Sequence, residues 1–340
     1  MIVLPLKLPI IALQCMALLR RLPKNHPMRP IIERDLRFWL KGYYGEKECV
    51  YYLSFLPEDQ YYIFHGIRLT DKKAFQMDLL IVSQSFALIA EVKNVSKKLI
   101  FKKESNHVIK EFNNEEEGIQ NPILQVKRQR MQFINWLEHR QIKGLPIERL
   151  VVISKTSTLV ETTPDNQQIY KELIYAESII DKIQELEKKY DKPRFSKKNL
   201  TQLVDLLLDN HQPLITDILQ TYKISKDEIK TGVICPKDQI STMTYYSGSW
   251  HCSNCHFSSK TAHLPTVDDY FLLLGPTITR KQLGEFLHIG STFIAGKMVR
   301  ALGLPFTGSK RGTTYFLPQK YEFIQPKEKD IKLPNAYFPR

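Results

Sequence analysis

The sequence predicts an α/β protein in which helices flank a mixed sheet, followed by a small cysteine-containing β module and a helical C-terminal region. Three observations carry this prediction. Through residues 31–209 the patterns come in the order helix, three strands, helix, strand, helix, which is typical of α/β layer folds. Three of the five cysteines cluster between Cys235 and Cys255. Two short helix patterns near the C-terminus are joined by a turn that contains Gly290, a spacing typical of helix-turn-helix units.

The first helix and the first three strands are predicted from periodicity and composition. Apolar residues recur with a mostly helical period between Ile31 and Phe55. Gly42 and Gly45 fall inside this pattern, and because glycine weakens helices, we expect the helix to begin or bend there. Three later stretches are rich in β-branched and aromatic residues and are separated by turn-forming residues. They predict strands at residues 61–69, 75–83 and 86–94.

The later elements of this domain follow from local signals. The polar stretch 105–118 predicts a loop. Because proline suits the first helical turn, Asn121 and Pro122 open a helix that runs to about Arg140. A continuous apolar run at 150–154 is typical of a buried strand. Helix patterns follow at residues 168–189 and 197–209, and we expect a helical connector at 213–230.

Length and composition indicate a multidomain protein with a polyanionic partner. At 340 residues and 39.8 kDa, the chain is long enough for two or three domains. A hydrophobic content of 43% and a charged content of 25% are normal for a soluble globular protein. The 49 Lys+Arg against 36 Asp+Glu leave a net charge of +13, which favours nucleic acid or an anionic membrane surface as the partner.

The apolar segment from Met1 to Leu19 lacks the organisation of a signal peptide or membrane anchor. It has no basic leading region, Lys7 interrupts it, and Pro5 and Pro9 break it. We therefore expect an arm packed on the domain, with membrane attachment as the alternative. The cysteines are spaced like a metal site rather than a disulfide framework, which favours a reducing compartment and thus the cytoplasm.

A cluster of two carboxylates and a lysine is predicted where two strands end. Alternate side chains share a face of a strand, so Glu91 and Lys93 project together, and Asp78 can join them from the neighbouring strand. Desolvated charges must be paired or must bind a cation. Carboxylates that hold one or two Mg²⁺ ions can activate a water and neutralise a phosphate, which suits phosphodiester cleavage. The alternative is that Asp78 ends an exposed strand and that Glu91 and Lys93 form a solvated pair.

Several stretches in the first domain occur in the order of a known family: Gly42 with Gly45 and Glu46, Arg68 with Leu69, Phe75 to Ile81, Ile89 to Asn94, and Asn121 to Gln125. Together they resemble the NERD (nuclease-related) domain, a branch of the PD-(D/E)xK restriction-endonuclease-like superfamily. Residues Arg20 to Pro27 also resemble the N-terminal arm of Bacillus-type members. The resemblance covers roughly residues 15–160 and implies a restriction-endonuclease-like mixed sheet.

The resemblance also implies an activity and a set of site residues. Asp78 and Glu91 would be metal ligands for Mg²⁺ or Mn²⁺, and Lys93 would be the catalytic lysine. Glu46 would be an auxiliary acid from the helix and a further metal ligand. Gln125 matches a family position, although it can equally cap or pack within its helix. The implied reaction is hydrolysis of phosphodiester bonds in DNA.

The clustered cysteines predict a zinc-ribbon-like module. Cys252 and Cys255 form a knuckle whose thiolates can share one tetrahedral zinc ion, and Cys235 with Asp238 resembles the partner knuckle. Asp238 stands at the fourth position and can supply an oxygen ligand, unless a histidine replaces it or the module has lost its metal. The candidate histidines are His251 and His256. We expect one structural zinc, because no open coordination position is implied.

The C-terminal region predicts a nucleic-acid-binding module. Helix patterns at residues 279–287 and 291–302 have helix-turn-helix spacing, and residues 308–317 look like a small hairpin wing. Basic side chains that can meet phosphates are Lys297, Arg300, Lys310 and Arg311. The alternative is a helical hairpin with a solvated basic face.

The predicted organisation has six parts: an N-terminal arm (1–30), a NERD nuclease-like domain (31–212), a helical connector (213–229), a zinc-ribbon-like module (230–264), a helix-turn-helix or winged-helix-like region (265–325) and a tail (326–340). We expect a Mg²⁺-dependent nuclease that cuts DNA, without a small-molecule substrate, and that can act as a homodimer to cut both strands. Two alternatives stay open: a DNA-binding or scaffold protein that no longer cuts, and a membrane-surface or partner-binding protein.

Overall fold

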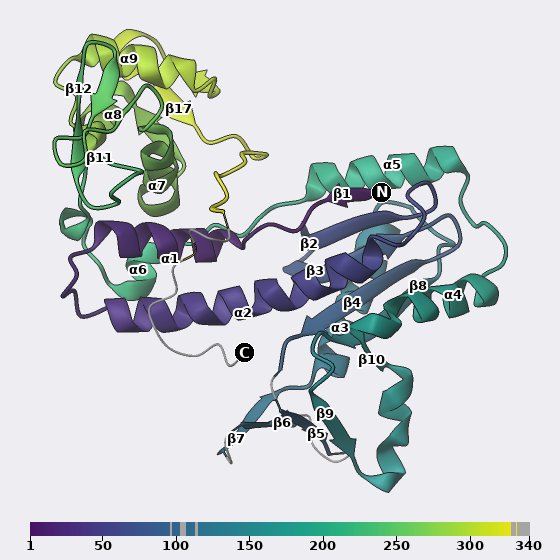
Figure 1. Ribbon diagram of the computed structural model, residues 1–340. Coiled ribbons are helices and arrows are strands. Elements are labelled where there is room, and N and C mark those ends of the chain that lie inside the picture. The colour runs from purple at the N-terminus through teal and green to yellow at the C-terminus, as the bar shows by residue number, and fades with distance from the viewer. Residues whose placement is uncertain (96, 103–106, 113–114, 328–330, 332–340) are drawn as a thin grey trace. The chain divides into compact units, whose positions relative to one another are not determined.

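A six-stranded mixed sheet organises the first part of the computed structural model, which describes residues 1–95, 97–102, 107–112, 115–327 and 331 (Figure 1). The strand order is β1-β2-β3-β4-β8-β10, in which β2–β3 and β3–β4 are antiparallel and the other neighbours are parallel. The strands are β1 (Ile2–Leu4), β2 (Tyr62–Thr70), β3 (Ala74–Val82), β4 (Ala87–Lys93), β8 (Ile147–Ile153) and β10 (Leu173–Tyr175). The mixed sheet expected from the sequence is confirmed.

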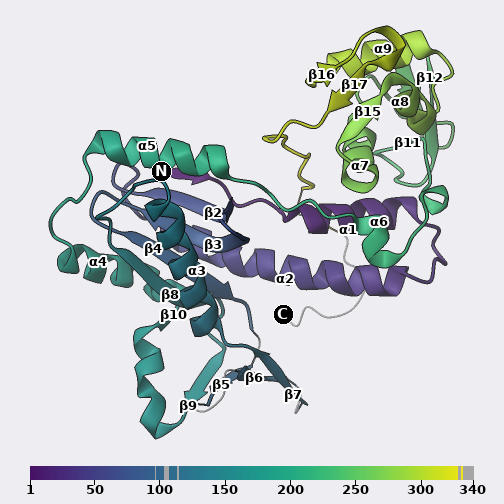
Figure 2. The same ribbon diagram turned by 180° about the vertical axis from the view of Figure 1, so that it is seen from behind.

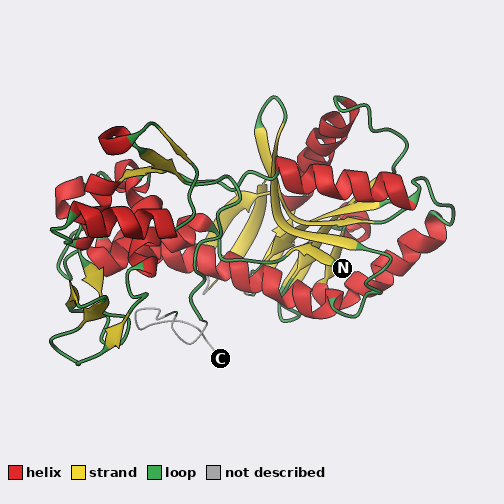
Figure 3. Cartoon of the chain, turned by 90° about the horizontal axis from the view of Figure 1, so that it is seen from above, coloured by secondary structure: helices red, strands yellow, loops and turns green. Residues whose placement is uncertain are grey.

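Helices cover both faces of this sheet. On one face, α3 (Pro122–Glu138) and α5 (Lys197–Asn210) contribute apolar side chains to one core cluster. On the other face, the C-terminal turns of α2 (Arg29–Leu53) and the whole of α4 (Ile179–Lys189) contribute to a second cluster. Figures 1 and 2 show α2 and α3 on opposite sides of the strands, and Figure 3 shows the strands of this part between helices.

Two predicted features of the helices are corrected. The first helix does not begin at its glycines, because α2 runs from Arg29 through Gly42 and Gly45 to Leu53. The helix predicted at residues 168–189 starts only at Ile179. The preceding residues form a 3₁₀ segment and then β10, whose parallel pairing with β8 overrides the local helical pattern.

A second, four-stranded sheet replaces most of the loop predicted at residues 105–118. Its order is β7-β6-β5-β9, with β5 (Lys98–Phe101), β6 (His107–Phe112), β7 (Glu115–Gln120) and β9 (Leu159–Thr162). Residues 105–106 and 113–114 of the predicted loop lie outside the described residues. The strands were missed because β6 and β7 carry many charged residues, so that pairing rather than apolar alternation defines them.

The chain divides into two compact units. Unit 1 comprises Met1–Lys7 and Leu40–Pro213, and unit 2 comprises Leu8–Trp39 and Leu214–Arg340. The segment expected to form an N-terminal arm contributes β1 to the sheet of unit 1 and the helix α1 (Ile10–Arg21) to unit 2. The six-part organisation drawn from the sequence remains a prediction.

Unit 2 contains a small β module and a winged-helix-like region. The module is an antiparallel sheet in the order β11-β12-β13-β14, built from β11 (Val233–Ile234), β12 (Thr242–Tyr246), β13 (Ser249–His251) and β14 (Ser258–Ser259). The region that follows comprises α7 (Leu264–Leu274), β15 (Thr277–Thr279), α8 (Arg280–Leu287), α9 (Thr292–Ala301), β16 (Phe306–Thr307) and β17 (Thr314–Phe316). Its strands pair in the order β15-β17-β16.

The two predicted C-terminal helices are confirmed, together with the N-cap of the second. Thr279 Oγ1 accepts a hydrogen bond from Gln282 N at 3.2 Å at the start of α8, and Ser291 Oγ accepts one from Ile294 N at 3.4 Å at the start of α9. The connector expected at residues 213–230 is less helical than predicted, with α6 (Ile218–Tyr222) and one 3₁₀ turn. Within the part of the chain that the structure describes, no helix combines the length and the apolar character needed to cross a membrane.

Candidate active site and metal cluster

Asp78 lies where β3 and β4 stop pairing. Their antiparallel register extends from Val82↔Ala87 to Leu79↔Ala90, and the next backbone donor along β4 turns to a side chain instead. Val92 N donates to Asp78 Oδ2 at 3.0 Å. The carboxylate of Asp78 therefore takes the place of a ladder hydrogen bond and is held against β4.

The side-chain alternation of β3 changes phase at this point. Met77 and Leu80, three residues apart, contribute to the same core cluster, although residues an odd number apart on a regular strand face opposite sides. On the paired strand, Gly66 has φ +61°, a left-handed conformation that glycine adopts readily. This local irregularity sets the direction of Asp78, and the sequence alone did not reveal it.

Glu91 and Lys93 project from the same face of β4 toward α3. Lys93 Nζ donates to Glu91 Oε1 at 2.7 Å and to Gln125 Oε1 at 3.1 Å. Glu91 is 2% exposed, and Gln129 Nε2 donates to its second oxygen, Oε2, at 2.7 Å. The structure thus excludes the alternative of a solvated Glu91–Lys93 pair.

Gln129 is a site residue that the sequence analysis missed. It lies one helical turn after Gln125, and residues four apart share a helix face, so its position was readable once Gln125 was placed. Its Oε1 atom is buried and has no hydrogen-bond partner among the described residues. Gln129 therefore presents one unused acceptor beside the carboxylate of Glu91.

Glu46 reaches the cluster because α2 packs tightly on the ends of β4 and β8. A Cβ atom on Gly45 would lie 2.5 Å from Asn94 Cβ and 3.2 Å from Ser154 Oγ, distances at which something must shift. In addition, Asn94 Nδ2 donates to Lys41 O at 2.7 Å. Glycine at position 45 is thus the reason that the neighbouring Glu46 lies close enough for its charge to act on the other carboxylates.

The carboxyl groups of the cluster repel one another. Burial, and then the charge of Glu91, raises the pKa of Asp78 to about 8, while the ammonium of Lys93 opposes this rise. Burial, and then the charges of Asp78 and Glu91, raises the pKa of Glu46 well above its usual value. Three carboxyl groups thus share one lysine, and a divalent cation would supply the missing positive charge.

The five residues predicted for this site are brought into one neighbourhood by β3, β4, α2 and α3. Their roles as metal ligands and catalytic groups remain predictions. The carboxylate oxygens of Glu46, Asp78 and Glu91 do not all lie within 4.8 Å of one another. Among the described residues, ligand atoms that are this close together are found at the cysteine cluster.

The cysteine cluster brings four ligand atoms together in unit 2. The Sγ atoms of Cys235, Cys252 and Cys255 and a carboxylate oxygen of Asp238 all lie within 4.8 Å of one another. The Cys235 and Cys255 sulfurs are 3.5 Å apart, close to the ~3.8 Å that a tetrahedral site with Zn–S bonds of about 2.3 Å requires. The donor set fits a structural metal such as zinc, and the fourth position is Asp238 rather than either histidine.

The two knuckles have matching backbone geometry. Gln239 N donates to Cys235 O at 2.8 Å, and His256 N donates to Cys252 O at 3.1 Å. Gln239 and His256 also share a left-handed conformation, with φ +59° and +56°. Asp238 therefore occupies the position that Cys255 holds in the other knuckle.

The carboxylate of Asp238 is oriented for ligation. Ile240 N and Ser241 N each donate to Asp238 Oδ1 at 2.9 Å, and Asn254 Nδ2 donates to Oδ2 at 3.1 Å. These hydrogen bonds, led by those from the backbone, hold the pKa of Asp238 well below its usual value. The backbone hydrogen bond at Phe257 likewise lowers the pKa of the Cys255 thiol, which favours the thiolate form that binds metals.

The predicted nucleic-acid-binding residues lie on α9 and after β16. Lys297, Arg300 and Lys310 are exposed, whereas the side chain of Arg311 lies outside the described part of the chain. The structure adds Phe293, a 65% exposed aromatic residue on α9 whose ring centroid is 4.7 Å from Lys297 Nζ. An exposed aromatic ring beside basic groups is a common feature of nucleic-acid-binding surfaces.

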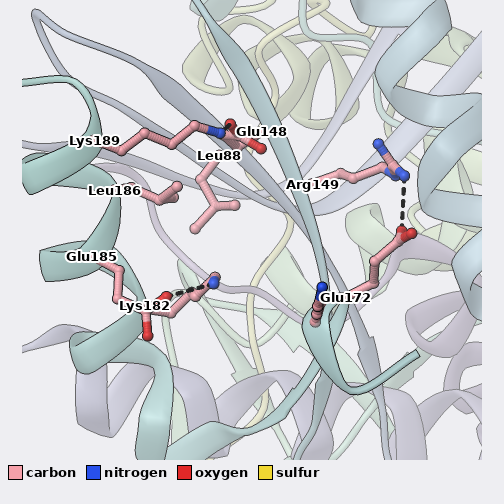
Figure 4. A pocket seen from close by; sticks show the side chains of 9 residues that line it. Leu88, Glu148, Arg149, Glu172, Lys182, Glu185, Leu186 and Lys189 are labelled. Atoms are coloured by element: carbon pink, nitrogen blue, oxygen red, sulfur yellow. Dashed lines mark hydrogen bonds and ion pairs between the residues drawn. The ribbon is translucent and has the colours of Figure 1, made fainter. Parts of the chain in front are cut away.

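A pocket of ≈ 310 Å³ lies elsewhere in unit 1 (Figure 4). Most of the charged side chains that line it form ion pairs with one another: Lys182–Glu185 at 2.6 Å, Arg149–Glu172 at 2.9 Å and Lys189–Glu148 at 2.8 Å. Leu88 in this pocket precedes Lys93 by five residues on β4, a separation of about 16 Å along a strand. The pocket is therefore not part of the carboxylate cluster.

Comparison with known families supports the relationship of unit 1 to nucleases. Residues 41–154, about a third of the 340-residue chain, match the family described as the nuclease-related domain, NERD. This segment contains Glu46, Asp78, Glu91, Lys93 and Gln125, but neither the cysteine cluster nor the winged-helix-like region. Comparison with curated proteins and with solved structures gives no match.

Proposed function

We propose that unit 1 is a metal-dependent nuclease that hydrolyses phosphodiester bonds of DNA. The observation that carries the proposal is the convergence of Glu46, Asp78 and Glu91 with Lys93 at the ends of β3 and β4, inside a segment that matches a nuclease-related family. A non-cleaving scaffold would have no use for carboxyl groups whose mutual repulsion opposes folding.

The carboxylates of Asp78, Glu91 and Glu46 would hold Mg²⁺ or Mn²⁺, which would supply Lewis-acid activation of water and charge neutralisation at phosphorus. The protein groups prepare the remainder of the site. Gln129 fixes one oxygen of Glu91, and Lys93 fixes the other. Two of the three N–H bonds of the Lys93 ammonium are used within the described residues, which leaves one for a phosphate oxygen or the attacking water.

We propose that unit 2 delivers the nucleic acid. Residues 286–321 contain five Lys or Arg residues and no Asp or Glu, and they include α9 and the hairpin of β16 and β17. Such a surplus of positive charge favours phosphate contacts that position the protein without reading sequence. The cysteine cluster would hold a structural zinc ion beside this region in the chain, and its thiolates suit a reducing compartment such as the cytoplasm.

The test is cleavage of supercoiled, linear and single-stranded DNA and of RNA by the purified full chain, in Mg²⁺, Mn²⁺ or EDTA. Asp78→Asn and Lys93→Met should each lower the cleavage rate by about 100-fold or more, because each removes a group that acts at the reacting phosphate. Matched controls are Glu185→Gln and Lys182→Met, which alter an ion pair at the distant pocket. Those controls should cleave like the wild type.

Cleavage that is equal in all five proteins, or that persists in EDTA, would contradict the proposal. DNA binding without cleavage by the wild type would favour the alternative of a nuclease-like scaffold. Preferential cleavage of RNA would keep the reaction class and correct the substrate.

A further inference from the structure

The second sheet of unit 1 grows directly out of the candidate active site. β5 follows β4 along the chain, β9 follows β8, and both the β4–β8 and the β5–β9 pairs are parallel. The junction is fixed by hydrogen bonds from Thr158 Oγ1 to Val95 O at 2.5 Å and from Leu159 N to Lys97 O at 2.6 Å. The sheet β7-β6-β5-β9 thus begins within a few residues of Lys93 and can serve as a wall beside the site.

The two faces of this sheet differ in how their lysines are compensated. On one face, Lys98 Nζ lies 3.0 Å from Glu161 Oε1 and 3.7 Å from Glu111 Oε2, so two carboxylates neutralise one ammonium. The opposite face carries the core side chains of Leu99, Phe101 and Val108. Lys110 lies on that same face, because it follows Val108 by two residues and pairs with Leu99. Lys110 Nζ is 2.8 Å from Glu117 Oε2, its carboxylate partner.

Two further lysines lie on the elements that meet at this junction. Asn94 Nδ2 donates to Lys41 O at 2.7 Å, which fixes this turn of α2 beside the residue that follows Lys93. Ser154 N donates to Lys93 O at 3.1 Å, so Lys155 leaves β8 next to the end of β4. Lys41 and Lys155 are both half-buried, and no side-chain hydrogen bond or ion pair joins either to a carboxylate among the described residues.

The three lysines act on one another as like charges. The pKa of Lys41 is lowered first by burial and then by the charges of Lys110 and Lys155, and the charge of Glu117 raises it. Two like charges and one carboxylate therefore act on the Lys41 ammonium. Such a surplus opposes folding unless an anion occupies the space between the groups.

We propose that Lys41, Lys110 and Lys155 form a phosphate-binding cleft for the nucleic-acid backbone, next to the carboxylate site. The proposal rests on the proposed function, which supplies a polyanionic substrate for Lys93 and the carboxylates. Each of three elements at the junction contributes one lysine: Lys41 comes from α2, Lys110 from β6 and Lys155 from the end of β8. Because lysine contacts phosphate as a point charge, this cleft positions the backbone and reads no sequence.

The cleft explains the second sheet, for which the carboxylate chemistry alone gives no reason. The sheet places Lys110 on the face of its buried apolar residues and leaves Lys98, which two carboxylates compensate, on the other face. A backbone held by several ammonium groups would bring one phosphodiester bond to Lys93 while flanking phosphates stay neutralised. The cleft therefore separates substrate positioning from chemistry.

The test is lysine acetylation of the full chain in EDTA, with and without a 30-nucleotide single strand or a 30-base-pair duplex, read by mass spectrometry at each lysine. Lys110 has a matched control in Lys182: their side chains are 26% and 27% exposed, and each ammonium contacts one glutamate. We expect Lys41, Lys110 and Lys155 to be protected at least threefold by nucleic acid and Lys182 to be unchanged. Protection confined to Lys297 and Lys310 would overturn the cleft and place the nucleic acid on unit 2 alone.

Substitutions provide a second measurement that does not depend on cleavage. Lys41→Gln with Lys155→Gln should reduce the salt dependence of binding, measured in EDTA, by a slope of about 1.4 for a single strand, because each lost phosphate contact contributes about 0.7. The control pair, Lys182→Gln with Lys189→Gln, should leave the slope unchanged. Equal slopes in both double variants would overturn the cleft.

The two proposals can fail separately. Loss of cleavage in Asp78→Asn with full protection of the three lysines would support both. Protection without any wild-type cleavage would refute the nuclease and leave the cleft as a binding site. Cleavage without protection would refute the cleft.

Discussion

The carboxylate cluster of unit 1 and the cysteine cluster of unit 2 gather ligands in different ways. The cysteine cluster draws its four donors from residues 235–255, within two turns of one small sheet. The carboxylate cluster draws on a helix, two strands and a second helix between Glu46 and Gln129. The first is therefore a local structure, and the second exists only once a whole domain has folded.

The carboxyl groups of the two clusters respond oppositely to their surroundings. Hydrogen bonds from backbone N–H groups lower the pKa of Asp238, so this carboxylate is stabilised before any ion binds. Burial and neighbouring carboxylates raise the pKa of Asp78 and of Glu46. The difference teaches that Asp238 is stabilised by its own fold, whereas the carboxylate cluster of unit 1 stores repulsion that a cation can relieve.

The largest effect on either cluster is expected when the metal is removed from the cysteine cluster of unit 2. We expect one zinc ion per purified chain, and we expect Cys252→Ser to lose it and unfold residues 233–259, because zinc binding contributes on the order of 10 kcal/mol to such small modules. Elemental analysis and amide hydrogen exchange of β11–β14 would measure this.

Asp238→Cys is the informative control for that experiment. It completes a four-cysteine site in knuckles that already match, so it should retain one zinc ion per chain and the hydrogen-exchange protection of the wild type. A wild-type chain that holds no metal and still protects β11–β14 would show that the module is stable as a metal-free relic.

Much of the fold was predictable because local signals agreed with tertiary contacts. The strands that became β2, β3 and β4 and the helices that became α3, α8 and α9 all carry strong periodic or capping signals. The failures lie where pairing decides the structure. β6 and β7 are polar strands, and β10 is held in place by its pairing with β8. None of these three strands could therefore be recognised from composition.

A second comparison sets two glycines of one helix against each other. A Cβ on Gly45 would meet Asn94 Cβ at 2.5 Å, whereas one on Gly42 would meet nothing within 4 Å. Gly45→Ala should therefore destabilise unit 1 by about 2–3 kcal/mol, since α2 must move away from β4. Gly42→Ala should stabilise it by roughly 0.5–1 kcal/mol, since alanine favours helices. Urea unfolding measures both, and stabilisation of equal size in the two variants would show that helix propensity, rather than close packing, determines the effect.

The carboxylate site was predictable in its residue types but not in its contacts. Asp78, Glu91 and Lys93 could be placed because alternate residues of a strand share a face. The phase change at Asp78, the close approach at Gly45 and the hydrogen bond from Gln129 could not, because each depends on a neighbouring element. The lysines of the proposed cleft were likewise hidden, since they come from α2, β6 and the end of β8.

A pH titration in EDTA tests the contrast between the raised pKa of Asp78 and the lowered pKa of Asp238. Because the folded-state pKa of Asp78 is raised to about 8, above its unfolded value of 3.8, the folded chain retains a proton that the unfolded chain loses. Stability contributed by this group is therefore full below pH 4 and is lost as the pH rises toward 8. Asp78→Asn cannot lose that proton, so it should match the wild type near pH 4 and exceed it increasingly as the pH rises, by a few kcal/mol at pH 9.

Hydrogen exchange of β3 and β4 at each pH reports this difference without interference from unit 2. Glu185→Gln is the control, because its carboxylate is 64% exposed and its pKa is lowered by Lys182 instead of raised. Added Mg²⁺ should restore the wild type at pH 9 and leave Asp78→Asn nearly unchanged, since the cation replaces the lost proton only where the carboxylate remains. A wild type whose β3–β4 exchange is constant from pH 5 to 9 would show that the three carboxylates are already compensated within the fold, and the contrast with Asp238 would disappear.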